Sequence, residues 1–349
     1  MKIRVSSRPA GMALILAMIA IFVFSALAAG FALSMKVEAR LAQTSDAGQQ
    51  FLWAGRAGAE LACWTLANHP PDPYDSLTQL WAGGPGSQTE SNSILRYVPF
   101  DHYQIDDNVW VEVRIEDLDR KININTATPD IIQQVFNRMN YGPDVVSVVS
   151  DSILDWIDAD DMPRAAGAES DYYQGLPMPY YAKNAPIDDI AELRLIKGVT
   201  AEMFEGGSST NYVRSAFEHK LGFGAMTGPP ADFGLKDIFT PVSSGRVNIN
   251  TADVNVLSML LSGDTNTAAA IVQARTGPDG VDFRSVGDLG RANIPAQAIQ
   301  QLNSSCSTRS LVYQAHVVVH VGDLPPRDYY ATLYLNSPMD IRILNFYWR

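Results

Sequence analysis

The chain has 349 residues, of which 46% are hydrophobic and 18% are charged, and its formal net charge is −12. The length exceeds a single small core, the composition excludes a wholly disordered chain, and the acidic balance opposes binding to nucleic-acid phosphates. Two cysteines, Cys63 and Cys306, exclude a disulfide framework and a Cys-rich zinc module, and leave one bridge between them open.

The N-terminus carries the most specific pattern. Lys2, Arg4 and Arg8 precede a stretch, residues 12–35, that contains no charged side chain. A helix of that length and composition spans a bilayer, whereas a secretory signal has a shorter apolar core followed by a small-x-small cleavage site. Apolar residues then recur at helical spacing from Val37 to Trp64. We therefore predict one long helix that ends near Asn68, with a weak point at residues 43–50.

The basic leader ending at Gly11, with Met12 opening the apolar run, resembles the class III leader of type IV pilins and pseudopilins. The resemblance implies that a prepilin peptidase cleaves after Gly11 on the cytoplasmic side, and that the mature, methylated chain begins at Met12. Most members of that family carry a Glu at the fifth mature position, which here is Leu16.

The missing glutamate has a physical interpretation. A carboxylate in lipid costs several kcal/mol and needs a partner. In the family that partner is taken to be the N-terminal amine of the subunit above, so a subunit with nothing above it has no use for the Glu. Its absence is typical of K-type pseudopilins. The alternative for the segment alone is a generic single-pass anchor on a periplasmic or extracellular domain.

The body is predicted to contain an antiparallel sheet. Residues 70–86 are rich in Pro and Gly and end the helix. Residues 109–115 alternate apolar and polar side chains, and residues 312–319, 329–335 and 341–348 are rich in β-formers. We predict an α+β, pilin-like domain at 36–118 and 305–349, interrupted by a large, mostly helical inserted domain at 119–304.

The inserted domain contains an internal repeat. Residues 121–127 and 246–252 match nearly residue for residue, and an apolar helix pattern follows each copy, with Thr or Asn expected as the cap. Asn-Ile-Asn-Thr-Ala is a known opening of helix-hairpin-helix (SAM-like) modules, which often bind DNA. A membrane-anchored DNA receptor is therefore one rival function. The acidic charge and residues 261–265, which lack a Gly-x-Gly turn, oppose it.

An acidic loop follows the first repeat. Its carboxylates repel one another unless a cation relieves them, and hard oxygen ligands without His or Cys favour calcium over zinc. Asp188 and Asp189 are candidate additional ligands from the next segment. The alternative is a solvated loop that also caps the helix starting near Asp188. The predicted calcium ligands are Asp158, Asp160, Asp161, Glu169 and Asp171.

This acidic loop is similar to the signature of general secretion pathway protein K. With the leader, the paired repeats and the closing residues 341–344, the resemblance spans nearly the whole chain. It implies calcium in the loop and a minor pseudopilin of the type II secretion system. Such a protein caps the pseudopilus tip with I-type and J-type minor pseudopilins, and initiates assembly for export of folded proteins across the outer membrane.

The same resemblance implies a single-pass inner-membrane protein with its body in the periplasm, and no nucleic-acid or small-molecule substrate. A type IV pilus minor pilin at the analogous tip position is the second rival. No phosphate loop, nucleophile elbow or His-Glu zinc helix occurs in the sequence. The acidic set Asp155, Asp158 and Asp160 could imitate the carboxylate pair of a glycosidase, but no cleft is recognisable around it. We therefore expect that the protein is not an enzyme.

Two smaller clusters each have two interpretations. Four tyrosines after the acidic loop either form a partner surface or pin the loop to its own domain. Two histidines on one strand face are either a metal pair or ordinary exposed strand residues. The residues concerned are Tyr172, Tyr173, Tyr180 and Tyr181 in the first cluster, and His316 and His320 in the second.

Overall fold

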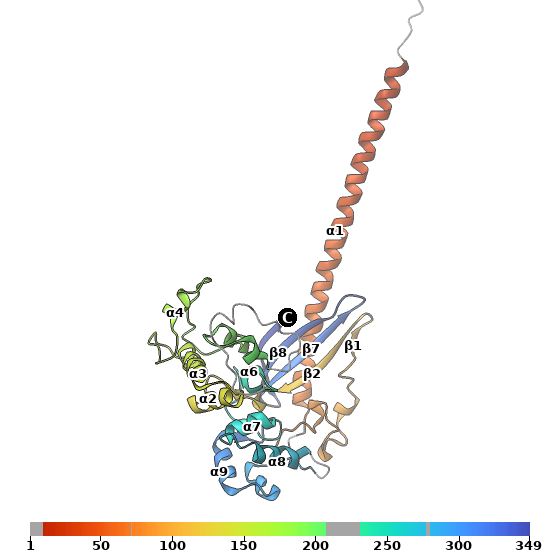
Figure 1. Cartoon of the computed structure of the whole chain (residues 1–349). Helices are drawn as coiled ribbons and strands as arrows, with labels where there is room; N and C mark the ends of the chain where they lie inside the picture. Colours follow the sequence, from red (N-terminus) through yellow and green to blue (C-terminus); the bar gives the residue numbers. More distant parts are fainter. Residues whose placement is uncertain (1–9, 71, 207–230, 277–279) are drawn as a thin grey trace, which may run out of the picture.

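The computed structural model describes residues 10–70, 72–206, 231–276 and 280–349. A single 58-residue helix, α1 (Ala10–Ala67), projects from a globular head (Figure 1). Its exposed stretch Leu14–Glu38 is long and apolar enough to cross a membrane, close to the predicted 12–35. The helix continues through the predicted weak point at residues 43–50. The basic leader residues Lys2, Arg4 and Arg8 lie outside the described residues.

The head is built on a five-stranded antiparallel sheet with the order β1-β2-β7-β8-β9. The four predicted strands are confirmed, and the strand before the insertion pairs with the strand after it, in the register Val113 opposite Val317. Strand β1, which is only four residues long and exposed throughout, was not predicted. The strands are β1 (Tyr103–Asp106), β2 (Val109–Asp117), β7 (Val312–Val321), β8 (Arg327–Ser337) and β9 (Asp340–Trp348).

Small residues let α1 lie close to one face of this sheet. Gly55 and Gly58 face it: a Cβ built on Gly58 would lie 2.4 Å from Cγ1 of Val317, and one on Gly55 would lie 2.8 Å from the ring of Tyr329. Ala54, at the same interface, is 3% exposed. The apolar core of the pilin-like domain is therefore formed by a small-residue helix face against valine and tyrosine side chains of the strands. Between α1 and β1 lie three short 3₁₀ turns, η1 (Leu80–Ala82), η2 (Gln88–Glu90) and η3 (Ile94–Tyr97).

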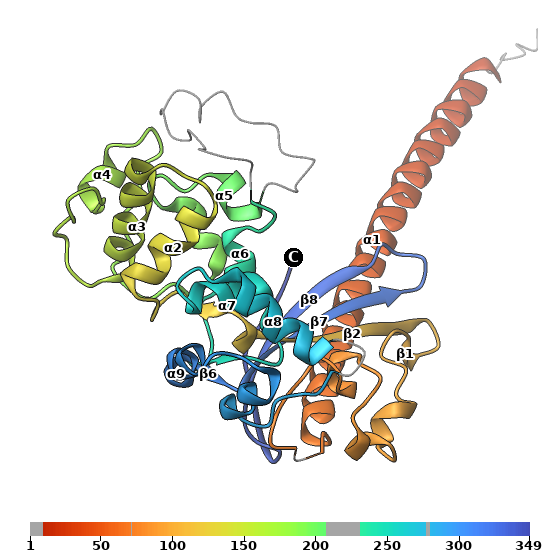
Figure 2. The same cartoon turned by 60° about the horizontal axis from the view of Figure 1, so that its bottom comes forward.

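The insertion between β2 and β7 consists of two modules, which lie to one side of the sheet (Figure 2). Each begins with a two-residue strand and closes on a second one in parallel, β3 with β4 and β5 with β6. The first module follows η4 (Leu118–Arg120) and contains β3 (Ile122–Asn123), α2 (Pro129–Arg138), α3 (Pro143–Ile157), α4 (Ser170–Gln174), η5 (Ile190–Leu195), α5 (Ala201–Glu205), α6 (Leu235–Ile238) and β4 (Phe239–Thr240). The second contains β5 (Val247–Asn248), α7 (Val254–Leu260), α8 (Thr265–Thr276), η7 (Val286–Ala292), α9 (Ala296–Ser305) and β6 (Cys306–Ser307).

The repeated Asn-Ile-Asn sequence has the same structural role in both modules. The side-chain amide of Asn125 donates to the carbonyl of Ile187 at 2.9 Å and accepts from its N–H at 2.7 Å. Asn250 makes the same two bonds to Phe283, at 2.8 and 2.9 Å. Each second asparagine of the repeat thus ties a distant loop to the start of its module, and the sequence repeat is a structural duplication.

The helix caps of the two modules differ. Thr128 caps α2, as the pattern predicts, through its hydroxyl and the N–H of Ile131. The prediction of Thr or Asn is wrong for α7, whose N-terminal amides are bound by Asp253. A carboxylate is at least as good a cap as an amide because it also interacts favourably with the helix dipole. Cys63 and the buried Cys306 are both free thiols, so the bridge left open by the sequence is not formed.

Candidate metal centre

Three of the five predicted ligands meet at one end of α3. Asp158 is the C-cap of α3, Glu169 is the N-cap of α4, and Asp160 lies in the loop between them. One carboxylate oxygen from each of these residues lies within 4.8 Å of the other two. Two helix ends and a short loop therefore gather three negative charges around one point.

The buried oxygens at this point lack hydrogen-bond donors. Glu169 is 3% exposed, and neither of its carboxylate oxygens has a hydrogen-bond partner. Oδ1 of Asp158 is also buried without a partner. Burial, with the charges of Asp155 and Asp158, raises the pKa of Glu169 to about 7. Orphaned carboxylate oxygens facing other carboxylates fit a bound cation, and an all-oxygen donor set fits calcium.

Asn184 contacts the loop that carries Asp160 and was not predicted as a ligand. Its side-chain N–H₂ donates to the carbonyl of Asp160 at 3.1 Å and to Oδ1 of Asp161 at 2.8 Å, which leaves its own amide oxygen buried without a partner. Its backbone has a positive φ of 47°, which asparagine tolerates. Its place in the Asn-Ala-Pro segment, residues 184–186, was the one available signal.

The other predicted ligands lie outside the group. Asp161 is bound by Asn184, and Asp171 is exposed in the first turn of α4. Asp188 forms a 2.7 Å ion pair with Lys183, and Asp189 caps η5. The helix near Asp188 is thus capped by its own aspartate, and the acidic loop does not supply that cap.

An ion pair between Arg164 and the buried carboxylate of Asp155 lies next to this group. Asp155 is fully buried, and its carboxylate accepts from the guanidinium of Arg164 at 2.6 Å. The same guanidinium nitrogen lies 2.5 Å from Oδ2 of Asp158. Gly167 lies against the other side of Asp155, where a Cβ would be 1.8 Å from Oδ2. Asp158 therefore has one oxygen held by Arg164 and one free for a cation.

We expect Gly167→Ala to destabilise the protein by about 2 kcal/mol, because the added methyl group must displace either the buried carboxylate of Asp155 or the loop that carries Gly167. The free energy of unfolding in urea would measure the effect. Gly175→Ala is the matched control in the same module, because its Cβ would meet nothing closer than 3.4 Å. Equal stability of the two variants would contradict this packing argument.

The tyrosine cluster mostly pins the loop. Tyr173 is buried and packs edge-to-face on Trp156, with ring centroids 5.3 Å apart. The hydroxyl of Tyr180 donates to the carbonyl of Leu195 at 2.6 Å. Tyr181 is 72% exposed and takes no part in this packing core. The loop-pinning interpretation is therefore correct for Tyr173 and Tyr180.

The two strand histidines each bind a carboxylate. His316 lies 2.7 Å from Asp328, and His320 lies 3.1 Å from Glu112 and stacks on Trp110. The two histidines bind two different carboxylates, which favours the interpretation as ordinary strand residues over a pair of ligands for one metal ion.

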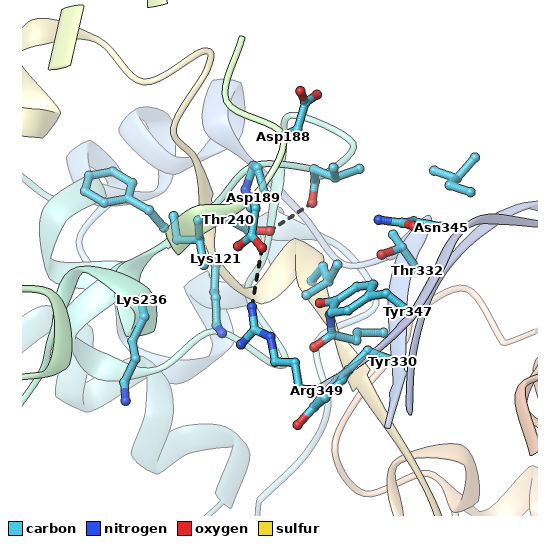
Figure 3. A pocket seen from close by; sticks show the side chains of 17 residues that line it. Lys121, Asp188, Asp189, Lys236, Thr240, Tyr330, Thr332, Asn345, Tyr347 and Arg349 are labelled. Carbon is cyan, nitrogen blue, oxygen red and sulfur yellow. Dashed lines mark hydrogen bonds and ion pairs between the residues drawn. The ribbon is translucent and has the colours of Figure 1, made fainter. Parts of the chain in front are cut away.

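A pocket lies between the sheet and the first module (Figure 3). Its volume is about 730 Å³. The charged side chains that line it are paired, for example Arg349 with Asp189 at 3.4 Å and Lys236 with Glu205 at 2.6 Å. The pocket therefore lacks an obvious set of free acid and base groups among the described residues.

Comparison with known proteins identifies similar sequences. Two protein-family models described as Type II secretion system (T2SS), protein K match residues 114–206 and 247–309, which fall on the first and second modules. The Type II secretion system protein K of Pseudomonas aeruginosa is 27% identical over 263 residues, covering 72% of this chain and 65% of that protein. The protein of the same name from Aeromonas hydrophila is 23% identical over 346 residues, covering 92% of this chain and 91% of that protein.

A solved structure has the same fold. It is the crystal structure of the GspK-GspI-GspJ complex from the enterotoxigenic Escherichia coli type 2 secretion system. The matched chain is 18% identical, with a TM-score of 0.63, and the match covers 88% of this chain and 98% of that one. The likeness extends over both the sheet and the insertion.

Proposed function

Because this chain belongs to the type II secretion system protein K family, we propose that it is a minor pseudopilin that acts at the tip of the pseudopilus. The observation that carries the proposal is the combination of a long, apolar N-terminal helix with a pilin-like sheet interrupted by the two family-matched modules. Such a protein is a structural component of a secretion machine, and the proposal assigns it no catalytic step.

Steric and electrostatic arguments support a terminal position. The two modules, which together extend from Ile122 to Ser307, lie beside the sheet (Figure 2). They make the head too wide to repeat along a thin helical fibre. The fifth position after Gly11 is Leu16, so the helix lacks the carboxylate that a subunit above would neutralise. A subunit at the tip needs neither a narrow head nor that carboxylate.

The partners follow from this position. The similar solved structure is a complex of GspK with GspI and GspJ, and we infer that this chain assembles with minor pseudopilins of the I and J types. Leu14–Glu38 would cross the inner membrane once, with the head in the periplasm, after a prepilin peptidase has cleaved between Gly11 and Met12. The net charge of −12 opposes binding to nucleic-acid phosphates.

We further propose that the first module holds calcium through Asp158, Asp160, Glu169 and the amide oxygen of Asn184. The orphaned buried oxygens support this proposal. Calcium would neutralise the carboxylates and tie the end of α3 to the start of α4 and to the Asn184 loop. Its expected role is to stabilise the module, since a bound ion that the unfolded chain lacks adds to folding free energy.

The function is tested by complementation. In a strain lacking this gene, the full-length protein should restore export of the folded secreted proteins and should co-purify with I-type and J-type pseudopilins. Gly11→Leu is the matched control: it should be made, keep its leader, and restore neither export nor the complex. Normal secretion without the gene, together with lost twitching motility, would favour a type IV pilus protein instead.

A further inference from the structure

The second module meets the pilin-like domain at a joint that is both buried and acidic. Three carboxylates from the pilin-like side converge there. Asp75 comes from the loop after α1, Asp117 from the end of β2, and Asp119 from η4. Their exposed fractions are 2%, 1% and 0%. Carboxylates are rarely buried without a charged partner, so this joint is unusual.

Asp117 connects the two units directly. Its Oδ2 accepts from the hydroxyl of Thr251, in the repeat of the second module, at 2.5 Å and from the hydroxyl of Ser310 at 2.6 Å. The amide of Asn248 completes the connection, donating to Ser310 Oγ at 2.8 Å and to the carbonyl of Asp75 at 3.0 Å. Among the described residues, the side-chain amide of Asn123, the equivalent residue of the first module, donates no such hydrogen bonds. This connection to the pilin-like domain is therefore specific to the second module.

The other two carboxylates bind backbone amides. Asp119 accepts from Ser244 N at 2.6 Å and from Leu311 N at 2.7 Å, and Asp75 accepts from Ser310 N at 2.9 Å. These neutral donors hold the segments that enter and leave the second module. They stabilise the ionised carboxylates only in part, because each neutral hydrogen bond replaces one to water.

Cations are sparse around this joint. Arg309 lies 3.9 Å from Asp75 and its side chain is 58% exposed, while His69 lies 3.6 Å from Asp75 and 3.3 Å from Glu90. The buried guanidinium of Arg275 donates hydrogen bonds to the carbonyls of Ile249 and Ala252. The remaining titratable or charged groups nearby are Tyr313, whose hydroxyl donates to Ser310, the Glu116–Arg120 pair, Asp253 and Asp282.

We propose that this joint is a proton-sensitive clamp, which holds the second module firmly on the pilin-like domain in mildly acidic surroundings and loosens as they become alkaline. Burial, with the charge of Asp119, raises the pKa of Asp117 to about 7, and burial also raises the pKa of Asp75 and of Asp119. A carboxyl whose pKa is raised in the closed state stabilises that state when protonated. The stabilisation is complete below the ordinary aspartate pKa of about 4 and is lost as pH rises through about 7.

Hydrogen exchange of the full-length protein in lipid nanodiscs tests the clamp. Protection factors, corrected for intrinsic exchange rates, would be followed for residues 244–252 and 307–312 between pH 5.5 and 8.5. We expect opening of these segments to increase roughly thirtyfold across this range. Asp117→Asn, which mimics the protonated carboxyl, should remove most of the pH dependence, and Asp75 and Asp119, whose pKa values are also raised, account for the rest. Asp282→Asn should keep the pH dependence. The carboxylate of Asp282, in the second module, accepts from the hydroxyl of Thr78, in the pilin-like domain, at 2.7 Å, but it is not part of the buried cluster.

Opening that does not change with pH in the wild-type protein would overturn the proposal, as would a pH dependence in Asp117→Asn as large as that of the wild type. Should Asp117→Asn fail to fold, Thr251→Val gives the decision. It removes one donor to the ionised carboxylate and should move the midpoint of opening to higher pH, and an unchanged midpoint would reject the clamp. The result is independent of the proposed function, because it concerns only how two parts of this chain are joined.

Discussion

Removing calcium from the purified protein is expected to lower its thermal stability strongly, and Glu169→Gln is expected to remove most of that response. In the folded protein Glu169 is 3% exposed and without a donor, so an ion is the partner that would compensate its charge. With free calcium a thousandfold above its dissociation constant, the ion adds about 4 kcal/mol to the free energy of unfolding. Calorimetry of unfolding with excess calcium and with chelator measures the difference, and titration calorimetry measures binding itself.

The pH dependence of this response has a definite sign. Because the pKa of Glu169 is raised to about 7 in the metal-free fold, its contribution to metal-free stability is lost as pH rises through about 7. Calcium binding requires the ionised form. The calcium-dependent increase in melting temperature should therefore be larger at pH 8 than at pH 6.

Asp171→Asn is the matched control for Glu169→Gln. It removes one carboxylate from the same short helix, but its side chain is exposed and outside the group of three. The variant should keep the wild-type calcium response. A chelator effect that is equal in wild type and in Glu169→Gln would reject this group as the calcium site, even if calcium binds elsewhere.

Local patterns predicted most of the architecture. The apolar run, the alternation at residues 109–115 and the three C-terminal strands are short-range signals, and each strand lies where they place it. The membership of β2 in the same sheet as the three C-terminal strands also followed, because those strands needed a partner, but the pattern did not predict that this partner strand pairs with β7. Strand β1 was missed because its four residues are too short a run to stand out as a strand.

The candidate site was predicted less completely because its oxygens come from segments far apart in the chain. Asp158, Asp160 and Glu169 share one loop, so their types and spacing indicated a cation site. Asn184 reaches the site only because its loop folds back with a positive φ and donates to Asp160. Likewise, the sequence repeat showed a duplication but not that Asn125 and Asn250 clamp loops 62 and 33 residues further along the chain.

Gly58→Ala is expected to destabilise the pilin-like domain by about 2 kcal/mol, although alanine is the better helix former. In an exposed helix this change gains about 1 kcal/mol from helix propensity. Here the new Cβ would lie 2.4 Å from Cγ1 of Val317, a stiff β-branched side chain that is fully buried in the central strand β7. Overpacking of this kind costs 1–3 kcal/mol or more because the helix or the strand must move. Denaturant unfolding of the full-length protein in micelles measures the net effect.

Two further variants separate the steric cause from other effects of the substitution. Gly48→Ala lies on the same helix with open space around its Cβ, so it should be neutral or slightly stabilising. The second is Gly58→Ala combined with Val317→Ala, which creates room for the added methyl group. If the contact is the cause, the double variant should be at least 1 kcal/mol more stable than the sum of the two single effects predicts. Simple additivity would show that close approach of α1 to β7 does not explain the glycine.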